Sequence, residues 1–179
     1  AGRGHTRIVA VLLAAPGLEV NAADRVGQTA LMLAVGGGHT ETIAALLAAP
    51  GLDVNAAAGE GFTALIVAAD GGYTETVTAL LAVPGLDLNM ADGHGITALM
   101  VAAVGGHTET VAVLLAAPGI EVNAATGDGL TALMQAAHGG HTETVTALLA
   151  APGLDVNAAA GDGFTALMLA VGGGYTETA

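Results

Sequence analysis

The sequence contains no cysteine, lysine, serine or tryptophan. Without cysteine, neither disulfides nor thiolate metal sites can hold the fold. Without cysteine, lysine or serine, the side chains most often used for covalent catalysis are missing, and the threonines stand where helices are expected to begin. No stretch of about 18 or more uninterrupted apolar residues occurs, so no membrane-spanning helix is predicted.

Positive charge is also scarce. Three arginines stand against 16 acidic residues, which gives a net charge of -13. Nucleic acids and anionic membrane surfaces are bound mainly through cations, so this composition argues against both as partners. It favours a protein partner whose surface is basic or neutral.

A fixed spacing of 34 residues runs through the chain without an insertion. A period of this length is typical of solenoid repeats. Three residue types mark it: proline at Pro16, Pro50, Pro84, Pro118 and Pro152; asparagine at Asn21, Asn55, Asn89, Asn123 and Asn157; and threonine at Thr29, Thr63, Thr97, Thr131 and Thr165.

One unit, residues 123–156, shows what is repeated. Residues 123–129 are rich in turn formers and predict a loop or hairpin. A threonine that can serve as N-cap opens a first short helix over residues 131–137, which a pair of glycines ends. Residues 142–151 predict a second helix, with Glu143 in the first turn, where a carboxylate suits the helix dipole. The Pro-Gly pair that follows ends it.

Neither helix is long enough to be stable alone in water. Their apolar side chains must therefore be covered by the same residues of adjacent units, which is how a solenoid buries its core. In this unit these side chains are Leu133, Met134, Val145, Leu148 and Leu149. The predicted fold class is an all-α repeat of helix-turn-helix units.

The pattern resembles the ankyrin repeat over essentially the whole chain. The residues that carry the resemblance are Gly129-x-Thr131-Ala-Leu133, Ala136-Ala137, Gly140-His141, Glu143, Val145, Leu148-Leu149, Gly153 and Asp155-Val156-Asn157, with their equivalents in the other units. The resemblance implies an ankyrin-type solenoid whose units are joined by hairpin-like loops. Tetratricopeptide repeats share the period, but they need two longer helices and aromatic positions that are missing here.

Two departures from the ankyrin pattern affect the expected packing. The units have 34 residues in place of about 33. The usual Thr-Pro-Leu-His tetrapeptide stands here as Thr-Ala-Leu-Met, or as Thr-Ala-Leu-Ile at residues 63–66. The resemblance implies that a histidine hydrogen bond is lost, and we expect methionine or isoleucine to replace it with packing.

The units divide the chain into one array over residues 1–179. We expect a partial unit at residues 1–20, full units at 21–54, 55–88, 89–122 and 123–156, and a partial unit at 157–179. The first partial unit reads as a second helix without its first, and the last stops where its second helix should begin. Neither end carries the polar capping repeat that open arrays need, so the sequence predicts a segment of a longer array, or ends that partners cover.

Most columns of the repeat are nearly constant, so the columns that vary between units indicate candidate binding residues. They fall at the hairpin tips, directly before the capping threonine, after the first helix, and within the hairpin loop. The resemblance implies that such positions form a recognition surface along the concave face. The candidates are Asp24, Val26, Gln28, Glu60, Phe62, Asp70, His94, Ile96, Val104, Asp128, Leu130, His138, Asp162 and Phe164. The alternatives are drift at exposed positions and, for the apolar members, packing against the neighbouring hairpin.

Two other columns contain residue types that could bind a metal or act in catalysis. Histidine recurs at His5, His39, His107 and His141, but tyrosine replaces it at Tyr73 and Tyr175, which a metal site would not tolerate. A histidine that fixes the loop before the second helix explains this column. Glutamate recurs at unit spacing at Glu41, Glu75, Glu109, Glu143 and Glu177, which is typical of a solvated face and not of a paired acid and base. We therefore expect no catalytic residue, no metal and no cofactor.

The leading hypothesis is a non-catalytic scaffold or adaptor that binds a protein partner along the concave face. The alternative is an architectural subunit built into a large permanent complex or fibre, which the uniformity of the units favours. A targeting array joined to an enzyme outside residues 1–179 is a third class that stays open. The resemblance favours an intracellular location.

Overall fold

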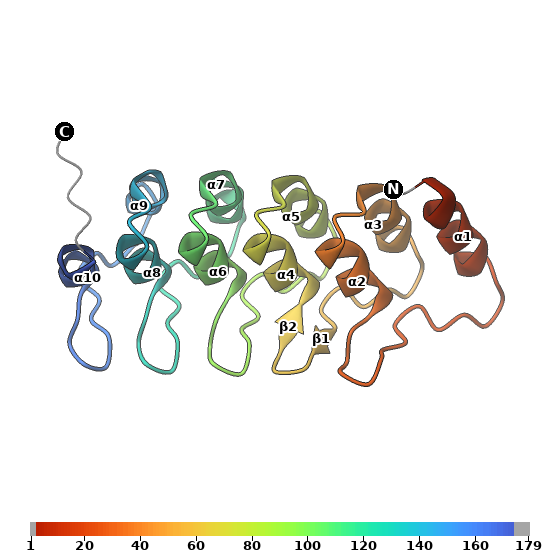
Figure 1. The fold of residues 1–179 in the computed structure, drawn as a ribbon, viewed down its shortest axis with the longest axis horizontal. Coiled ribbons are helices and arrows are strands. Elements are labelled where there is room, and N and C mark those ends of the chain that lie inside the picture. The colour runs from red at the N-terminus through yellow and green to blue at the C-terminus, as the bar shows by residue number, and fades with distance from the viewer. Residues whose placement is uncertain (1–2, 174–179) are drawn as a thin grey trace.

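The computed structural model describes residues 3–173 and shows two rows of short helices stacked side by side (Figure 1). The inner row holds the first helix of each unit: α2 (Ala30–Gly36), α4 (Ala64–Asp70), α6 (Ala98–Val104), α8 (Ala132–His138) and α10 (Ala166–Gly172). The outer row holds the second helices: α1 (Arg3–Leu13), α3 (Thr40–Leu47), α5 (Thr74–Leu81), α7 (Thr108–Ala116) and α9 (Thr142–Leu149). Inner helices pack on their neighbours in the row, and α2, α4, α6 and α8 also pack on the outer helix that follows. The molecule is therefore a helical repeat solenoid, as predicted.

Each inner helix begins at a threonine cap. In α8, the side chain of Thr131 accepts a hydrogen bond from the amide of Met134 at 3.4 Å, and its backbone is extended, with ψ of 167°. Gly139 ends the helix. The four other inner helices begin in the same way, so the predicted caps are confirmed.

The outer helices are slightly shorter than predicted. The expected helix over residues 142–151 ends at Leu149, with Ala150 as its C-cap. Ala151 precedes Pro152, and the residue before a proline is disfavoured in helical conformation, which explains the early end. The acidic residue predicted in the first turn, Glu143, is present there. The point at the end of the 157–179 unit where a second helix was expected to begin lies outside the described residues.

A hairpin precedes each inner helix and hangs below the inner row in Figure 1. In one unit it forms two short paired strands, β1 (Ala57–Ala58) and β2 (Phe62–Thr63). In the others the pairing is reduced to single bridges, such as Ala125 with Thr131. The turn needs glycine at Gly129, whose φ is 82° and where an added Cβ would lie 3.0 Å from the next hairpin.

The core consists of small and aliphatic side chains shared between units. Met134 is 1% exposed, and Met100 and Ile66 are equally well buried, so the expected packing at the missing histidine position is confirmed in these units but not at Met168, which is exposed. The prediction that Leu149 is covered was wrong, because it is 52% exposed. Its counterparts Leu81 and Leu115 are half-buried, and each of their units is followed by another described outer helix.

Asparagine side chains join consecutive units. Asn123 donates from Nδ2 to the carbonyl of Gly153 at 2.7 Å, and its Oδ1 accepts from the amide of Asp155 at 2.8 Å. The same pair of bonds recurs at Asn21, Asn55 and Asn89. These bonds hold the loops of neighbouring units in register, and they fix the stacking of the hairpins and inner helices.

Candidate protein-binding face

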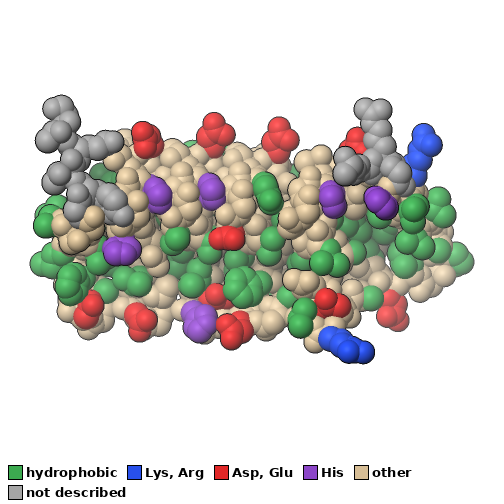
Figure 2. Space-filling view, in the orientation of Figure 1, with side chains coloured by type: hydrophobic (Ala, Val, Ile, Leu, Met, Phe, Trp, Pro, Cys, Tyr) green, Lys and Arg blue, Asp and Glu red, His purple; other side chains and the backbone are tan. Residues whose placement is uncertain are grey.

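The hairpins and the inner helices together form one face of the molecule. Figure 2 shows this face with acidic side chains along its upper and lower edges and hydrophobic side chains between them. The hairpins lie along the lower edge and the outer helices along the upper edge (Figure 1). The first turns of α5, α7 and α9 carry Glu75, Glu109 and Glu143. The face therefore has acidic borders and a mixed centre, in which hydrophobic side chains lie among histidine and acidic ones (Figure 2).

The structure brings the candidate residues onto the hairpins and the ends of the inner helices. Ile96 and Leu130 are half-buried, and the other candidates are exposed: Asp24, Val26, Gln28, Glu60, Phe62, Asp70, His94, Val104, Asp128, His138, Asp162 and Phe164. The candidates on hairpins lie at the tips or next to the capping threonine, and Asp70, Val104 and His138 each end an inner helix. Most candidate side chains are thus accessible to a partner.

Asp24 has a structural task inside its own hairpin. Its Oδ1 accepts hydrogen bonds from the amides of Val26 and Gln28, both at 2.9 Å. Asp92 makes the equivalent bonds to His94 and Ile96, and it is buried. Aspartate at this position therefore shapes its hairpin, and a contact with a partner would add to that role.

Backbone hydrogen bonds link the hairpin tips to one another. The amide of Gly59 donates to the carbonyl of Val26 at 2.8 Å, and the amide of Gly161 donates to the carbonyl of Asp128 at 2.8 Å. The tip carbonyl of His94 accepts from the following hairpin in the same way. The variable tip side chains therefore stand on a continuous, mutually braced stack.

Large apolar side chains are exposed on this face. Phe62 is 43% exposed, Phe164 is 45% exposed and Val104 is 51% exposed. The column before the capping threonine is divided: its phenylalanines are exposed, while Ile96 and Leu130 pack partly against the core. Exposed apolar groups gathered on one face are typical of interaction surfaces.

Leu33 is a further exposed apolar residue, on α2, that the sequence analysis did not single out. Its column contains Leu33, Val67, Val101, Gln135 and Leu169. The variation between units in this column was the available signal, and it was overlooked because all but one of these residues are aliphatic.

The charged groups on the face are mostly independent of one another. His94 Nε2 lies 3.1 Å from Glu60 Oε2, and both side chains are exposed. An exposed pair of this kind contributes little to stability because water screens it. The carboxylates at the tips are therefore available to a cationic partner.

Two histidines of the histidine column each tie their unit to the one before it. His107 donates from Nε2 to the carbonyl of Asp70 at 2.9 Å, and His141 donates to the carbonyl of Val104 at 2.8 Å. Both acceptors are the last residues of inner helices, whose carbonyls lack partners within the helix. Histidine thus fixes the loop before the outer helix, as predicted, and the bond also crosses to the preceding unit.

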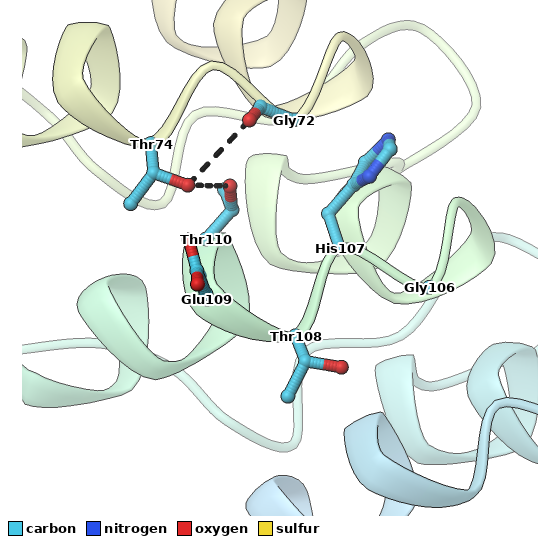
Figure 3. Close-up of a pocket in the computed structure, with 7 residues that line it drawn as sticks. All are labelled: Gly72, Thr74, Gly106, His107, Thr108, Glu109 and Thr110. Carbon is cyan, nitrogen blue, oxygen red and sulfur yellow. Dashed lines mark hydrogen bonds between the residues drawn. The ribbon is translucent and has the colours of Figure 1, made fainter.

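A shallow cavity of about 250 Å³ lies beside His107, between the N-terminal turns of α5 and α7 (Figure 3). The hydroxyl groups of Thr74 and Thr110 bond to each other at 2.9 Å. Glu109 is the one carboxylate that lines it. His107, which also lines the cavity, donates from Nε2 to the carbonyl of Asp70. Across residues 3–173, no cluster of three or more metal-ligating side chains is found.

Stacked helix pairs with projecting hairpins define a class of helical repeat solenoids, which present extended surfaces built from many units. The chain belongs to the ankyrin repeat family: the family model described as ankyrin repeats (3 copies) matches residues 1–92, 50–126 and 118–179. A search of curated proteins finds no match to the chain. Ankyrin repeats are generally protein–protein interaction modules, and the family is typically non-enzymatic. None of the described helices is long and apolar enough to cross a membrane.

Proposed function

We propose that this chain is a non-catalytic scaffold or adaptor that binds a protein partner along the face formed by the hairpins and inner helices. The observation that carries the proposal is the exposure of Phe62, Val104 and Phe164 on that face. Apolar side chains in water are costly to leave exposed, and a partner that covers them gains the free energy of their burial.

The pattern of variation supports the same face. The residues that join units, such as the asparagine and the capping threonine, recur in every unit. The tips and the ends of the inner helices differ from unit to unit, and these positions lie on the exposed face. A surface whose frame is constant and whose exposed side chains vary can recognise one partner along its length.

The net charge of -13 supports a partner with a basic or neutral surface. Complementary charge speeds the encounter of two proteins and disfavours partners of the same sign. Nucleic acid is disfavoured for the same reason, because its phosphates would meet a surface rich in carboxylates.

An architectural subunit in a large permanent complex or fibre is the second candidate. The observation in its favour is the uniformity of the joints between units, since Asn21, Asn55, Asn89 and Asn123 all make the same two bonds. Light scattering on the purified chain separates the candidates. A stable monomer supports a reversible scaffold, and growth into large species supports the architectural role.

The test of the binding face uses Val104→Arg as the face variant and Leu149→Arg as the matched control. Both residues are about half exposed, but Leu149 lies on the outer helix α9. Proteins retained from a cell extract are compared by mass spectrometry. We expect a partner that wild type and Leu149→Arg retain and that Val104→Arg loses. A partner that Val104→Arg retains and Leu149→Arg loses would place binding on the outer row.

A further inference from the structure

Four consecutive hairpins each carry one large apolar side chain directly before the capping threonine. These residues are Phe62, Ile96, Leu130 and Phe164, and we call them the hairpin strip. The two phenylalanines at its ends are exposed, and the two central residues are half-buried against the core. The first hairpin has Gln28 in this position, so the strip begins at the second hairpin.

The hairpin strip is continuous because neighbouring hairpins touch. A Cβ added at Gly61 would lie 2.8 Å from the Cα of Asp92, and one added at Gly95 would lie 3.1 Å from the Cα of Thr126. No side chain therefore fits between these hairpins. Since packed helices are roughly 10 Å apart, the members of the strip recur at about that interval.

Carboxylates border the hairpin strip on the side of the tips. Glu60, Asp128 and Asp162 stand at three of the four tips, and all three are exposed. The fourth tip carries His94, which pairs with Glu60. The nearest arginine in the sequence, Arg25, belongs to the first hairpin, outside the strip. The same four hairpins thus combine an apolar strip with an acidic border.

We propose that the hairpin strip is the docking site for an amphipathic helix of another protein, one whose apolar stripe is flanked by lysine and arginine. This inference rests on the proposed function and names the chemistry of the partner segment. Seven residues of an α-helix rise about 10.5 Å, so side chains seven positions apart meet the same position on consecutive hairpins. The long stems of lysine and arginine cover apolar surface while their charged ends reach the tip carboxylates.

A helix fits this site better than an extended segment does. An extended segment must find partners for its backbone amides and carbonyls, whereas a helix satisfies most of its own. The tip backbone is already used between hairpins, since the amides of Gly127 and Gly161 donate to the preceding tips. Side-chain contacts are therefore what the hairpin strip offers.

The probe is a fluorescent synthetic peptide that repeats Leu-Lys-Lys-Leu-Leu-Lys-Leu over about 21 residues, or roughly 30 Å of helix. Binding to the whole chain is followed by fluorescence anisotropy. We expect saturable binding of this peptide and none of its counterpart with glutamate in place of lysine. A scrambled peptide of the same composition, which has no apolar stripe, should bind at least about tenfold more weakly. Equal binding of the scrambled peptide would overturn the inference.

Substitutions then test whether the peptide binds at the hairpin strip. Phe62→Ala combined with Phe164→Ala should weaken binding about tenfold, because two anchors lose apolar contact. Leu149→Ala removes an exposed side chain from the outer helix α9 and should change the affinity less than about twofold. Since both phenylalanines are partly exposed, both variants should fold, which circular dichroism checks. Equal affinity of wild type and the double variant would overturn the inference.

Two variants that each neutralise three carboxylates give an independent test. The first variant neutralises the border of the strip with Glu60→Gln, Asp128→Asn and Asp162→Asn, and the second neutralises three outer-helix carboxylates with Glu75→Gln, Glu109→Gln and Glu143→Gln. We expect the first to weaken binding and reduce its salt dependence, and the second to leave the affinity within about twofold. Equal weakening by both would indicate diffuse attraction to an acidic chain and overturn the docking site.

The two proposals fail in different ways. A natural partner that depends on Val104, together with no site-dependent binding of the peptide, would overturn the docking inference and leave the proposed function standing. Failure of the proposed function appears instead in the capture experiment, as retained partners that are insensitive to Val104→Arg.

Discussion

Asparagine fastens each unit to the next because its amide group both donates and accepts. Asn123→Ala removes the bonds to Gly153 and Asp155. We expect the free energy of unfolding to fall by about 2 kcal/mol, from two hydrogen bonds of roughly 1 kcal/mol each. Urea denaturation followed by circular dichroism measures this change.

The matched control is Asn157→Ala, because the side chain of Asn157 has no hydrogen-bond partner within residues 3–173. It should change the free energy of unfolding by less than about 0.5 kcal/mol. Equal losses in the two variants would show that asparagine acts through the conformation of its own loop and not through the joint between units.

The number of residues between the two partners of a contact decided whether the sequence could predict it. A threonine cap acts on an amide three residues away, so its position alone predicted it, as at Thr131. The bond from Asn123 spans 30 residues, and the bond from His107 to Asp70 spans 37. Such contacts follow from the stacking of units. The period showed that these residues recur, but it did not show what they bind.

Inner helices differ from one another in how fully their neighbours cover them. Met134 in α8 is 1% exposed, whereas Met168 at the same position of α10 is 55% exposed. Met134→Ala should lower the free energy of unfolding by about 3 kcal/mol, since it removes buried contacts and leaves a cavity. Met168→Ala should cost less than about 1 kcal/mol. Thermal and urea unfolding of both variants test this difference.

The pair has a built-in control, because the residue, the substitution and the position in the helix are the same. Losses of similar size would mean that intrinsic helix propensity, and not coverage by adjacent units, dominates the effect. A loss at Met168 larger than that at Met134 would contradict the described packing altogether.

At the level of elements, the sequence predicted the helix pair and its limits well, because caps, glycines and prolines are local signals. Its error at Leu149 has a different origin. The apolar pattern treats Leu148 and Leu149 alike, but only Leu148 is fully buried. Coverage depends on which helices stand beside the residue, and that is a property of the array. The exposed positions of the candidate face could be predicted only as a set of variable columns. Packing of their apolar members was one expected alternative, but the sequence did not show that Ile96 and Leu130 would be the half-buried ones.

The excess of negative charge affects the stability of the whole molecule. The chain has 16 acidic residues and three arginines, and among the side chains that the structure describes, the one ion pair is the exposed contact of His94 with Glu60. Stacking the units brings carboxylates of successive units side by side along both edges of the face. Folding therefore concentrates like charges, and the screening of that repulsion should stabilise the array.

Raising sodium chloride from about 20 mM to about 0.5 M should increase the free energy of unfolding by about 1 kcal/mol, because the Debye length shortens to a few ångströms. Urea titrations at several salt concentrations measure this. The variant with Glu75→Gln, Glu109→Gln and Glu143→Gln should show a smaller increase, since part of the repulsion is already removed. A fall in stability with salt would show instead that attractive ion pairs hold the units together.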